Sequence, residues 1–261
     1  MKTFSERLQA GEVVFGATVM EYLRPSLVKT FCNAGFDFIF IEIEHALFSP
    51  ERLSDFILCV RDHGLPVVAK LGQLERAATA RLLEAGTLGI QLPRTESLDD
   101  LEQLQSFMKY SPLGTRASAT GYGNSAYAKP KNKRQWYDQM NDETFLVAHI
   151  ETRKGVENID QIVSLPGLDI CLVGTSDLSL DYGKPGDYKS TEFRALVQQV
   201  FDAAQKQGVA RGIPASDYDT VKYWIEHGVQ FFECATELDL LRAGASKTIE
   251  DLHRARDASV S

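Results

Sequence analysis

The sequence predicts a (β/α)8 barrel, in which eight parallel strands alternate with helices around one core. Three observations lead to this fold class. The chain has 261 residues, close to the ~250 that one such barrel needs. Eight short apolar runs, suited to buried strands, are separated by segments with helical spacing. Glycines stand where several of the helical segments should end.

The eight predicted strands share a high content of β-branched and aromatic residues. They are Val13–Val19, Phe36–Ile43, Pro66–Leu71, Thr87–Leu92, Phe145–Ile150, Leu168–Val173, Val209–Ile213 and Gln230–Ala235. Strands that alternate with helices imply parallel pairing and right-handed crossovers, and eight units in this length favour a closed barrel. An open doubly wound sheet is the competing arrangement, but no GxGxxG follows the first strand.

Helical spacing recurs between the strands and again at the end of the chain. The clearest intervening helices are Arg24–Ala34, Pro50–His63, Glu75–Ala85, Ser97–Met108 and Glu192–Gln207. A terminal helix is expected over Glu237–Asp257, which could cap its own barrel or pack on a neighbouring subunit. We expect one domain over residues 1–261 and no second domain.

Residues Tyr110–Thr144 interrupt the alternation of strands and helices between the fourth and fifth strands. The segment is too long for an ordinary connection between a strand and a helix. Long loops on compact domains are commonly lids or binding loops, so we expect a lid or a subunit-contact loop. Its basic stretch, Lys129–Arg134, is expected to be a solvated surface.

The net charge argues against two classes of binding partner. The net charge of −8 argues against nucleic acid and against an anionic membrane, since both select a basic face. No apolar run approaches the ~20 residues of a membrane helix, and the first residues resemble no signal peptide. The four cysteines lack metal-ligand spacing and are expected to be reduced thiols of a cytoplasmic protein.

The candidate site residues follow the predicted strands, because a barrel of this kind builds its active site at the carboxyl ends of its strands. Glu151 and Asp177 follow the fifth and sixth strands. Two carboxylates, with water and substrate, are a common ligand set for Mg²⁺. The alternative is that each acid only caps a helix.

Two further features have a functional and a structural interpretation. His45 follows the second strand and could be a general acid/base or a structural histidine. Gly174, Thr175 and Ser176 form a turn of small residues whose backbone N–H groups could hold an anion.

Five segments together resemble the HpcH/HpaI aldolase family, the metal-dependent class II pyruvate aldolases of the phosphoenolpyruvate/pyruvate barrel superfamily. The segments are IEIEHALF (Ile41–Phe48), SPLGTR (Ser111–Arg116), HIETRKGVENIDQI (His149–Ile162), GTSDLSLDYG (Gly174–Gly183) and ATELDLLRAG (Ala235–Gly244). The resemblance spans nearly the whole chain. It implies reversible aldol cleavage of a 4-hydroxy-2-oxoacid to pyruvate, or a close 2-oxoacid, and an aldehyde.

The resemblance also implies roles for individual residues. Glu151 and Asp177 would bind a divalent metal, with Mg²⁺, Mn²⁺ or Co²⁺ expected. The turn at Gly174, Thr175 and Ser176 would hold the carboxylate of the oxoacid. His45 would transfer a proton to or from the aldol hydroxyl.

Several positions depart from the pattern of the resembled family. Lys70 stands where members usually carry an arginine, Glu42 where they carry aspartate, and Arg94 where methionine is usual. Lys70 keeps the positive charge but not the bidentate fork, so Lys70, Arg94 or Arg116 could face the oxygen of the oxoacid. These changes leave three alternatives: decarboxylation or acyl-CoA hydroxyacid cleavage, a Schiff base on Lys70, and a non-catalytic binder of a metal–oxoacid complex.

The resemblance further implies a homo-oligomer, between a dimer and a hexamer, with exchange of the terminal helices. In such an assembly Glu84, where the family often has aspartate, could reach the active site of a neighbouring subunit.

Overall fold

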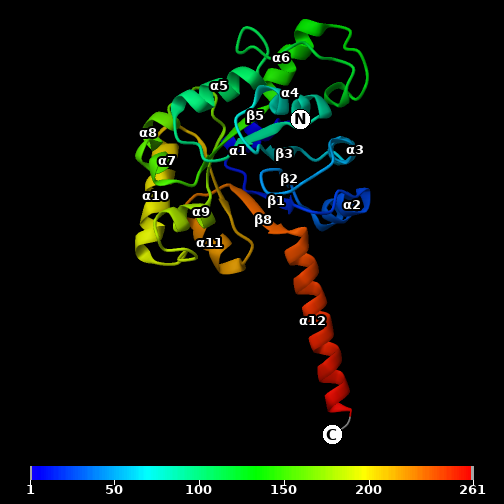
Figure 1. Cartoon of the computed structure of the whole chain (residues 1–261), viewed down its shortest axis with the longest axis vertical. Coiled ribbons are helices and arrows are strands. Elements are labelled where there is room, and N and C mark those ends of the chain that lie inside the picture. The colour runs from blue at the N-terminus through cyan, green and yellow to red at the C-terminus, as the bar shows by residue number, and fades with distance from the viewer. Residues whose placement is uncertain (1, 260–261) are drawn as a thin grey trace.

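The computed structural model describes residues 2–259 and confirms the closed barrel (Figure 1). The strands pair in parallel and in sequence order, and the last pairs with the first. They are β1 (Val14–Val19), β2 (Phe38–Glu42), β3 (Val67–Lys70), β4 (Gly89–Leu92), β5 (Phe145–Ile150), β6 (Ile170–Val173), β7 (Ala210–Pro214) and β8 (Phe231–Thr236). Each overlaps one of the eight predicted runs.

Helices form the outer layer and carry apolar stripes toward the strands. They are α2 (Pro25–Ala34), α3 (Pro50–Asp62), α4 (Arg76–Ala85), α5 (Leu98–Met108), α7 (Arg153–Glu157), α8 (Ile159–Ile162), α9 (Thr175–Asp181), α10 (Thr191–Lys206) and α11 (Tyr218–Glu226). A Ser, Asn, Asp or Thr side chain caps most of the longer ones, for example Ser97 at α5 and Ser190 at α10. Such caps satisfy backbone N–H groups that the helix itself cannot.

The buried residues form two cores, because alternate strand residues point into the barrel and out toward the helices. The larger core lies between strands and helices and includes Ile39, Ile41 and Leu146. The smaller core fills the barrel itself, where Phe38 and Phe231 stack with their ring centroids 4.5 Å apart.

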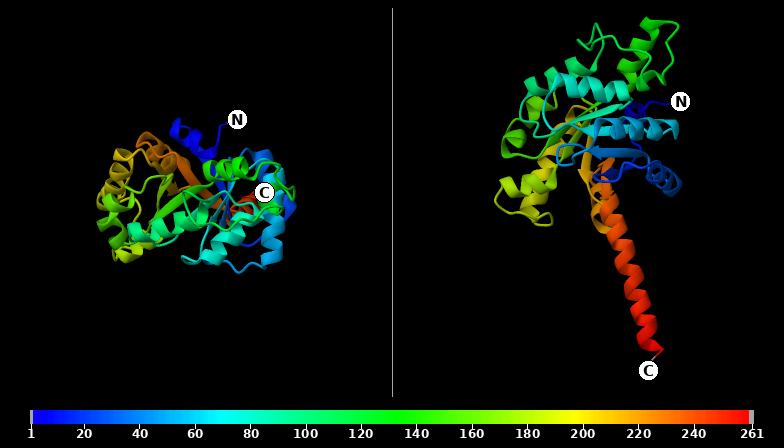
Figure 2. Two further views of the ribbon diagram at one scale, coloured as in Figure 1. Left: turned by 90° about the horizontal axis from the view of Figure 1, so that it is seen from above. Right: turned by 45° about the vertical axis from the view of Figure 1, so that its right-hand side comes forward.

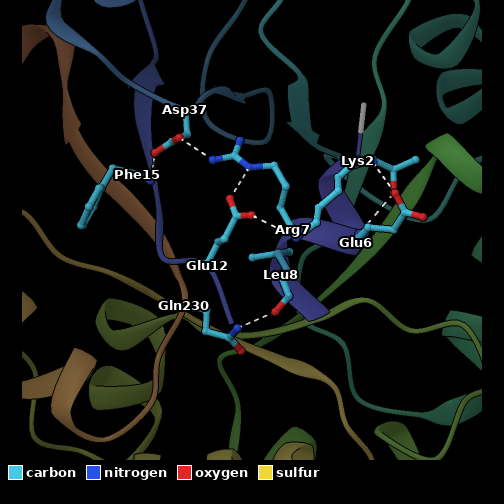
Figure 3. A network of polar contacts seen from close by, with 9 residues as sticks. Lys2, Glu6, Arg7, Leu8, Glu12, Phe15, Asp37 and Gln230 are labelled. Atoms are coloured by element: carbon cyan, nitrogen blue, oxygen red, sulfur yellow. Dashed lines mark hydrogen bonds and ion pairs between the residues drawn. The ribbon is translucent and has the colours of Figure 1, made fainter. Parts of the chain in front are cut away.

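A short helix that the sequence did not predict, α1 (Phe4–Gln9), closes the amino-terminal end of the barrel. Its Phe4 stacks on Phe145 inside that end. Figure 3 shows the polar network that holds α1: the Arg7 guanidinium donates to Glu12 and Asp37, each at 2.8 Å. The amide of Gln230 donates to the backbone oxygen of Leu8. The barrel is therefore plugged at this end.

The segment between β4 and β5 contains a 3₁₀ turn, η1 (Gly123–Ser125), and a helix, α6 (Lys133–Glu143). The segment packs at the amino-terminal ends of the strands, where Lys109 Nζ donates to the carbonyl oxygens of Asn141 and Thr144 at 2.6 Å. The expectation of a lid is therefore wrong within one chain, since a lid would have to cover the opposite end. A subunit contact stays a prediction.

The terminal helix α12 (Glu237–Ala258) leaves the barrel as a single projecting rod (Figure 2). Only its start is anchored: the Glu237 carboxylate accepts the backbone N–H groups of Met20, Glu21 and Tyr22 at 2.6–3.0 Å. The helix does not cap its own barrel, so that alternative is excluded. None of the helices within residues 2–259 combines the length and the apolar character that crossing a bilayer requires.

Candidate active site

The inward-facing positions change from apolar to polar along the barrel. Near α1 they are aromatic or aliphatic, and toward the carboxyl ends of the strands they become Thr18, Glu42, Lys70, Gln91, His149 and Glu233. The register places Glu42 beside Lys70, and Lys70 beside Gln91. The strand ends therefore hold a cluster of buried polar side chains, which we call the chamber, in an otherwise apolar interior.

Lys70 is the cation of this chamber. Its side chain is 5% exposed, and its Nζ lies 2.6 Å from Glu44 Oε2 and 3.3 Å from Glu42 Oε2. Burial alone would lower the pKa of Lys70, but the charges of Glu42, Glu44 and Glu151 outweigh burial and raise the pKa. Lys70 is therefore a permanent ammonium ion at neutral pH.

Glu42 also shapes the loop that carries His45. One of its oxygens, Oε1, accepts the backbone N–H groups of Glu44 at 2.7 Å and His45 at 3.3 Å. The imidazole of His45 is largely exposed, and its Nε2 lies 3.6 Å from Glu44 Oε2. Glu42 thus holds the backbone of Glu44 and His45 while its other oxygen pairs with the Lys70 ammonium.

Glu151 lies at the end of β5 and is 2% exposed. Its Oε1 accepts the backbone N–H of Arg94 at 2.6 Å, and its Oε2 lies 3.4 Å from His149 Nε2. Burial raises the pKa of Glu151 to about 7, against the lowering effects of Lys70 and of the Arg94 N–H. Asp177, in the first turn of α9, adds a smaller upward contribution to that pKa.

Arg94 reaches Glu151 through a constrained backbone. Its φ of 45° lies in the left-handed region, which costs a residue with a Cβ about 1–2 kcal/mol. The next residue fixes the turn, because Thr95 donates its N–H to the His149 carbonyl and its hydroxyl to the Leu92 carbonyl. The strained turn aims one N–H at the buried carboxylate.

Gly174 follows β6 and makes room for this carboxylate. A Cβ built there would overlap His149 Nε2 and lie 2.8 Å from Glu151 Oε2. Only glycine therefore allows the turn at Gly174, Thr175 and Ser176 to pass so close to Glu151.

Gly174→Ala is expected to displace the Glu151 side chain and to weaken Mn²⁺ binding roughly 10- to 100-fold, as mutations beside a ligand do. Isothermal titration of Mn²⁺ into metal-free protein measures the affinity. Gly244→Ala, where a Cβ meets nothing within 4 Å, is the matched control. Unchanged Mn²⁺ binding in Gly174→Ala would contradict the assignment of Glu151 as a ligand beside this turn.

Two predicted site residues lie elsewhere. Arg116 is buried, with its Cζ 4.5 Å from the ring centroid of Tyr110, and it lines a small cavity with Leu88 and Thr144 at the amino-terminal ends of β4 and β5. The prediction that Arg116 binds substrate is therefore wrong within one chain. Glu84 lies near the carboxyl end of α4, beside Gly123, so a role for it in a neighbouring subunit stays a prediction.

Three buried polar residues of the chamber were not among the candidate site residues: Gln91, His149 and Glu233. Gln91 Nε2 lies 3.2 Å from His149 Nδ1. His149 Nε2 and Glu233 Oε1 lack a hydrogen-bond partner among the described residues. Burial and the charge of Lys70 lower the pKa of His149 well below its usual value, so its ring is neutral. A single polar residue within an otherwise apolar strand run was the available signal.

Glu233 has the most perturbed carboxyl group of the chamber. Burial raises its pKa to about 8 from an ordinary 4.5, although Lys70 opposes the shift. Between these values the folded protein keeps a proton that the unfolded chain has released, so the stability of the protein falls as pH rises from about 4.5 to about 8.

Glu233→Gln removes this pH dependence, because the amide has the same shape and no proton to lose. We expect its free energy of unfolding to match that of the unsubstituted protein near pH 5 and to exceed it by about 3 kcal/mol at pH 8. Urea unfolding of metal-free protein at both pH values measures this difference. Glu102→Gln, on an exposed face of α5, is the control, and an equal gain at both pH values would show that Glu233 is ionised in the folded protein.

The residues at the strand ends fit a divalent metal held by few protein ligands. The described residues hold no cluster of three or more His, Cys, Asp or Glu side chains suited to a metal. Glu151 and Asp177 offer carboxylate oxygens only, the ligands that hard cations prefer, and water and substrate commonly complete such sites. Burial and, to a smaller extent, the charge of Asp177 raise the pKa of Glu151, and a bound cation would offset both costs.

Comparisons with known proteins show which family the chain belongs to. A hydroxypyruvate/pyruvate aldolase from Roseovarius nubinhibens is 26% identical, over 95% of each chain. A 5-keto-4-deoxy-D-glucarate aldolase from Shigella boydii is 26% identical over 82% of each chain. The crystal structure of an HpcH/HpaI aldolase from Desulfitobacterium hafniense superposes with a TM-score of 0.91 at 28% identity, covering 97% of both chains. Residues 20–243 match the model of the HpcH/HpaI aldolase/citrate lyase family, and the chain therefore belongs to that family.

Proposed function

We propose that this protein is a metal-dependent carbon–carbon lyase that cleaves a 4-hydroxy-2-oxoacid reversibly to pyruvate, or a close 2-oxoacid, and an aldehyde. One observation carries the proposal: the buried carboxylate of Glu151 faces the permanent cation Lys70 in the chamber at the carboxyl ends of the strands. Relatives named as aldolases support the reaction type.

Glu151 and Asp177 would hold the metal, with Mg²⁺, Mn²⁺ or Co²⁺ as candidates. When bound, such an ion acts as a Lewis acid toward the 2-oxo group. The protein itself supplies the anchoring N–H of Arg94, which fixes one oxygen of Glu151, and the close approach of the Gly174 backbone to that carboxylate. The backbone of Thr175 and Ser176 would hold the oxoacid carboxylate.

Cleavage requires a base for the 4-hydroxyl proton and a positive charge near the developing enolate. A base removes the proton of the 4-hydroxyl group, the bond between C3 and C4 breaks, and its electron pair moves toward the C2 oxygen. His45, whose imidazole is largely exposed, would exchange that proton through water. Lys70 places positive charge where the negative charge of the enolate develops. A proton added to C3 then completes pyruvate.

The ion pairs of Lys70 disfavour a Schiff base. A lysine must lose its proton to attack a carbonyl, and nucleophilic lysines have a lowered pKa. Lys70 has the opposite shift, because Glu42 and Glu44 stabilise its charged form. Borohydride trapping with pyruvate is therefore expected to leave Lys70 unmodified.

The test is the release of pyruvate from a panel of 4-hydroxy-2-oxoacids after the protein has been stripped of metal and reloaded with Mg²⁺, Mn²⁺ or Co²⁺. A coupled lactate dehydrogenase assay reports pyruvate, and the metal-free protein is the control. No release with any metal would contradict the proposal. Turnover of oxaloacetate without cleavage of any 4-hydroxy-2-oxoacid would point instead to a decarboxylase.

The projecting helix α12 supports a homo-oligomer. Its 22 residues expose a series of apolar side chains, which include Leu240, Leu241, Ile249 and Leu252. An isolated helix of this length is only marginally stable in water, and it gains stability by packing an apolar face. We propose that a second copy of the chain covers this face.

Replacement of Leu241 and Leu252 by glutamate is expected to convert the oligomer into a monomer, because each change places a charge on the proposed contact. Sedimentation equilibrium gives the mass of both proteins. Replacement of Glu250 and Arg254 by alanine, on the same helix, is the control. A monomeric unsubstituted protein would overturn the proposal, and so would an assembly that the double replacement leaves intact.

A further inference from the structure

Buried polar atoms without a hydrogen-bond partner gather around His149 in the chamber. Its Nε2 lacks a partner among the described residues, and so do Gln91 Oε1 and Glu233 Oε1. His149 lies on β5, close before Glu151, and its Nε2 is 3.4 Å from Glu151 Oε2. The proposed reaction uses none of these three side chains, although His149 lies against the proposed metal ligand.

The other ring nitrogen of His149 accepts a hydrogen bond. Gln91 Nε2 lies 3.2 Å from His149 Nδ1, and an amide nitrogen can only donate. Nδ1 therefore carries no proton, and the single proton of the ring is on Nε2. The Gln91 amide also donates toward the Glu233 carboxyl. That second acceptor fixes the direction in which the amide points.

Two groups lie against the Nε2–H of His149. One is Gly174, where a Cβ would overlap Nε2 and which has no side chain to accept the proton. The other is Glu151 Oε2, whose distance of 3.4 Å is slightly beyond the range of about 2.7–3.2 Å for an N–H···O bond. A buried N–H without an acceptor is costly, so a small shift of the ring or of the carboxylate that closes this gap is favourable.

A hydrogen bond from His149 would leave both oxygens of Glu151 held by the protein. Oε1 already accepts the backbone N–H of Arg94 at 2.6 Å. Each carboxylate oxygen has two lone-pair sites, so one donor on each oxygen leaves a lone pair on each for a cation. Outer residues commonly orient metal ligands in this way, and the loss of one lowers metal affinity roughly 10- to 100-fold.

We propose that His149 is a positioning residue for the metal ligand Glu151, to which it donates a hydrogen bond from Nε2 when the ion is bound. Gln91 and Glu233 hold the ring in the tautomer that this bond requires. His149 itself is not a ligand, because Nε2, the ring nitrogen that faces Glu151, carries the proton. The inference rests on the metal site of the proposed function.

The affinity for Mn²⁺ tests the role of His149 without any turnover. His149→Leu, which fills a similar space without an N–H, is expected to weaken Mn²⁺ binding roughly 10- to 100-fold in isothermal titration. His149→Gln, whose amide N–H can donate to the same oxygen, should retain most of the affinity. His63→Leu, at an exposed histidine, is the control. Equal affinity in folded His149→Leu would overturn the role of His149 and leave the metal site standing.

The tautomer of His149 is measured in the unsubstituted, metal-free protein, so this test does not depend on the folding of His149→Leu. Long-range proton–nitrogen correlations in NMR spectra of histidine-labelled protein report which ring nitrogen carries the proton, and the His149 signals are those missing in His149→Gln. We expect the proton on Nε2. A proton on Nδ1 would overturn the proposal, because Nε2 would then face Glu151 as a bare lone pair. An unsubstituted protein that binds no Mn²⁺ would instead refute the metal site itself.

Discussion

Replacement of Glu151 by Gln is expected to lower kcat/KM for pyruvate release by roughly 10³-fold or more, and to abolish measurable Mn²⁺ binding. A Lewis acid contributes several kcal/mol to such a transition state, and each 1.4 kcal/mol is a factor of ten. The amide keeps the shape of Glu151 but is a much poorer ligand for a hard cation. Metal titration and the coupled pyruvate assay measure the two losses.

The same replacement should not destabilise the protein. Burial raises the pKa of Glu151 to about 7, so in metal-free protein its ionisation reduces stability as pH rises through that value. Gln avoids this cost, and at pH 8 the variant should unfold at an equal or higher urea concentration. Glu157→Gln, on the exposed side of α7, is the control for activity. A Glu151→Gln protein that folds and keeps a tenth of the activity would contradict the metal assignment.

Replacement of Lys70 by Met is expected to lower the free energy of unfolding by about 3–5 kcal/mol, because it leaves buried carboxylates without their cation. Glu42 and Glu44 both lose their ion pair. Urea unfolding measures the cost, and adding Glu42→Gln to Lys70→Met should recover part of it, since the two residues act as a pair.

If Lys70 is catalytic, its replacement lowers the rate of the reaction as well as the stability of the protein. Exchange of pyruvate methyl protons should slow in Lys70→Met under conditions where the variant is fully folded, because the enolate loses a positive charge. Lys70→Arg keeps the charge and should retain more of the exchange than Lys70→Met. Equal exchange rates in folded Lys70→Met and the unsubstituted protein would show that Lys70 is only structural.

Local sequence signals predict the fold because each strand and the helix after it are built from residues close together in the chain. Every strand run and the glycine or cap beside it lie within about ten residues of one another, and the right-handed crossover leaves little choice of topology. The expected Phe145–Ile150 strand is reproduced without change, while the expected Thr87–Leu92 strand begins later, at Gly89. Helix α1 was missed, since six residues carry too little periodicity to be recognised.

The site was predictable where a residue follows a strand and less so where it lies within one. Glu151, Lys70, Glu42 and Arg94 meet at the carboxyl ends of β2 to β5 as strand-end placement implied. Arg116 failed because its position depends on how a long segment packs, and that segment returns to the amino-terminal ends of the strands. Asp177 lies close enough to affect the pKa of Glu151, and its role as a ligand stays a prediction.

The order of residues along this chain establishes the barrel, its family and the end of the barrel at which chemistry belongs, because strand period and motif spacing are properties of neighbouring residues. It does not establish the charge balance of the chamber. Glu233 lies more than 160 residues after Lys70, and only closure of the barrel buries the two together and raises the pKa of Glu233 to about 8. Burial and distance set that electrostatic energy, and both exist only once the chain has folded.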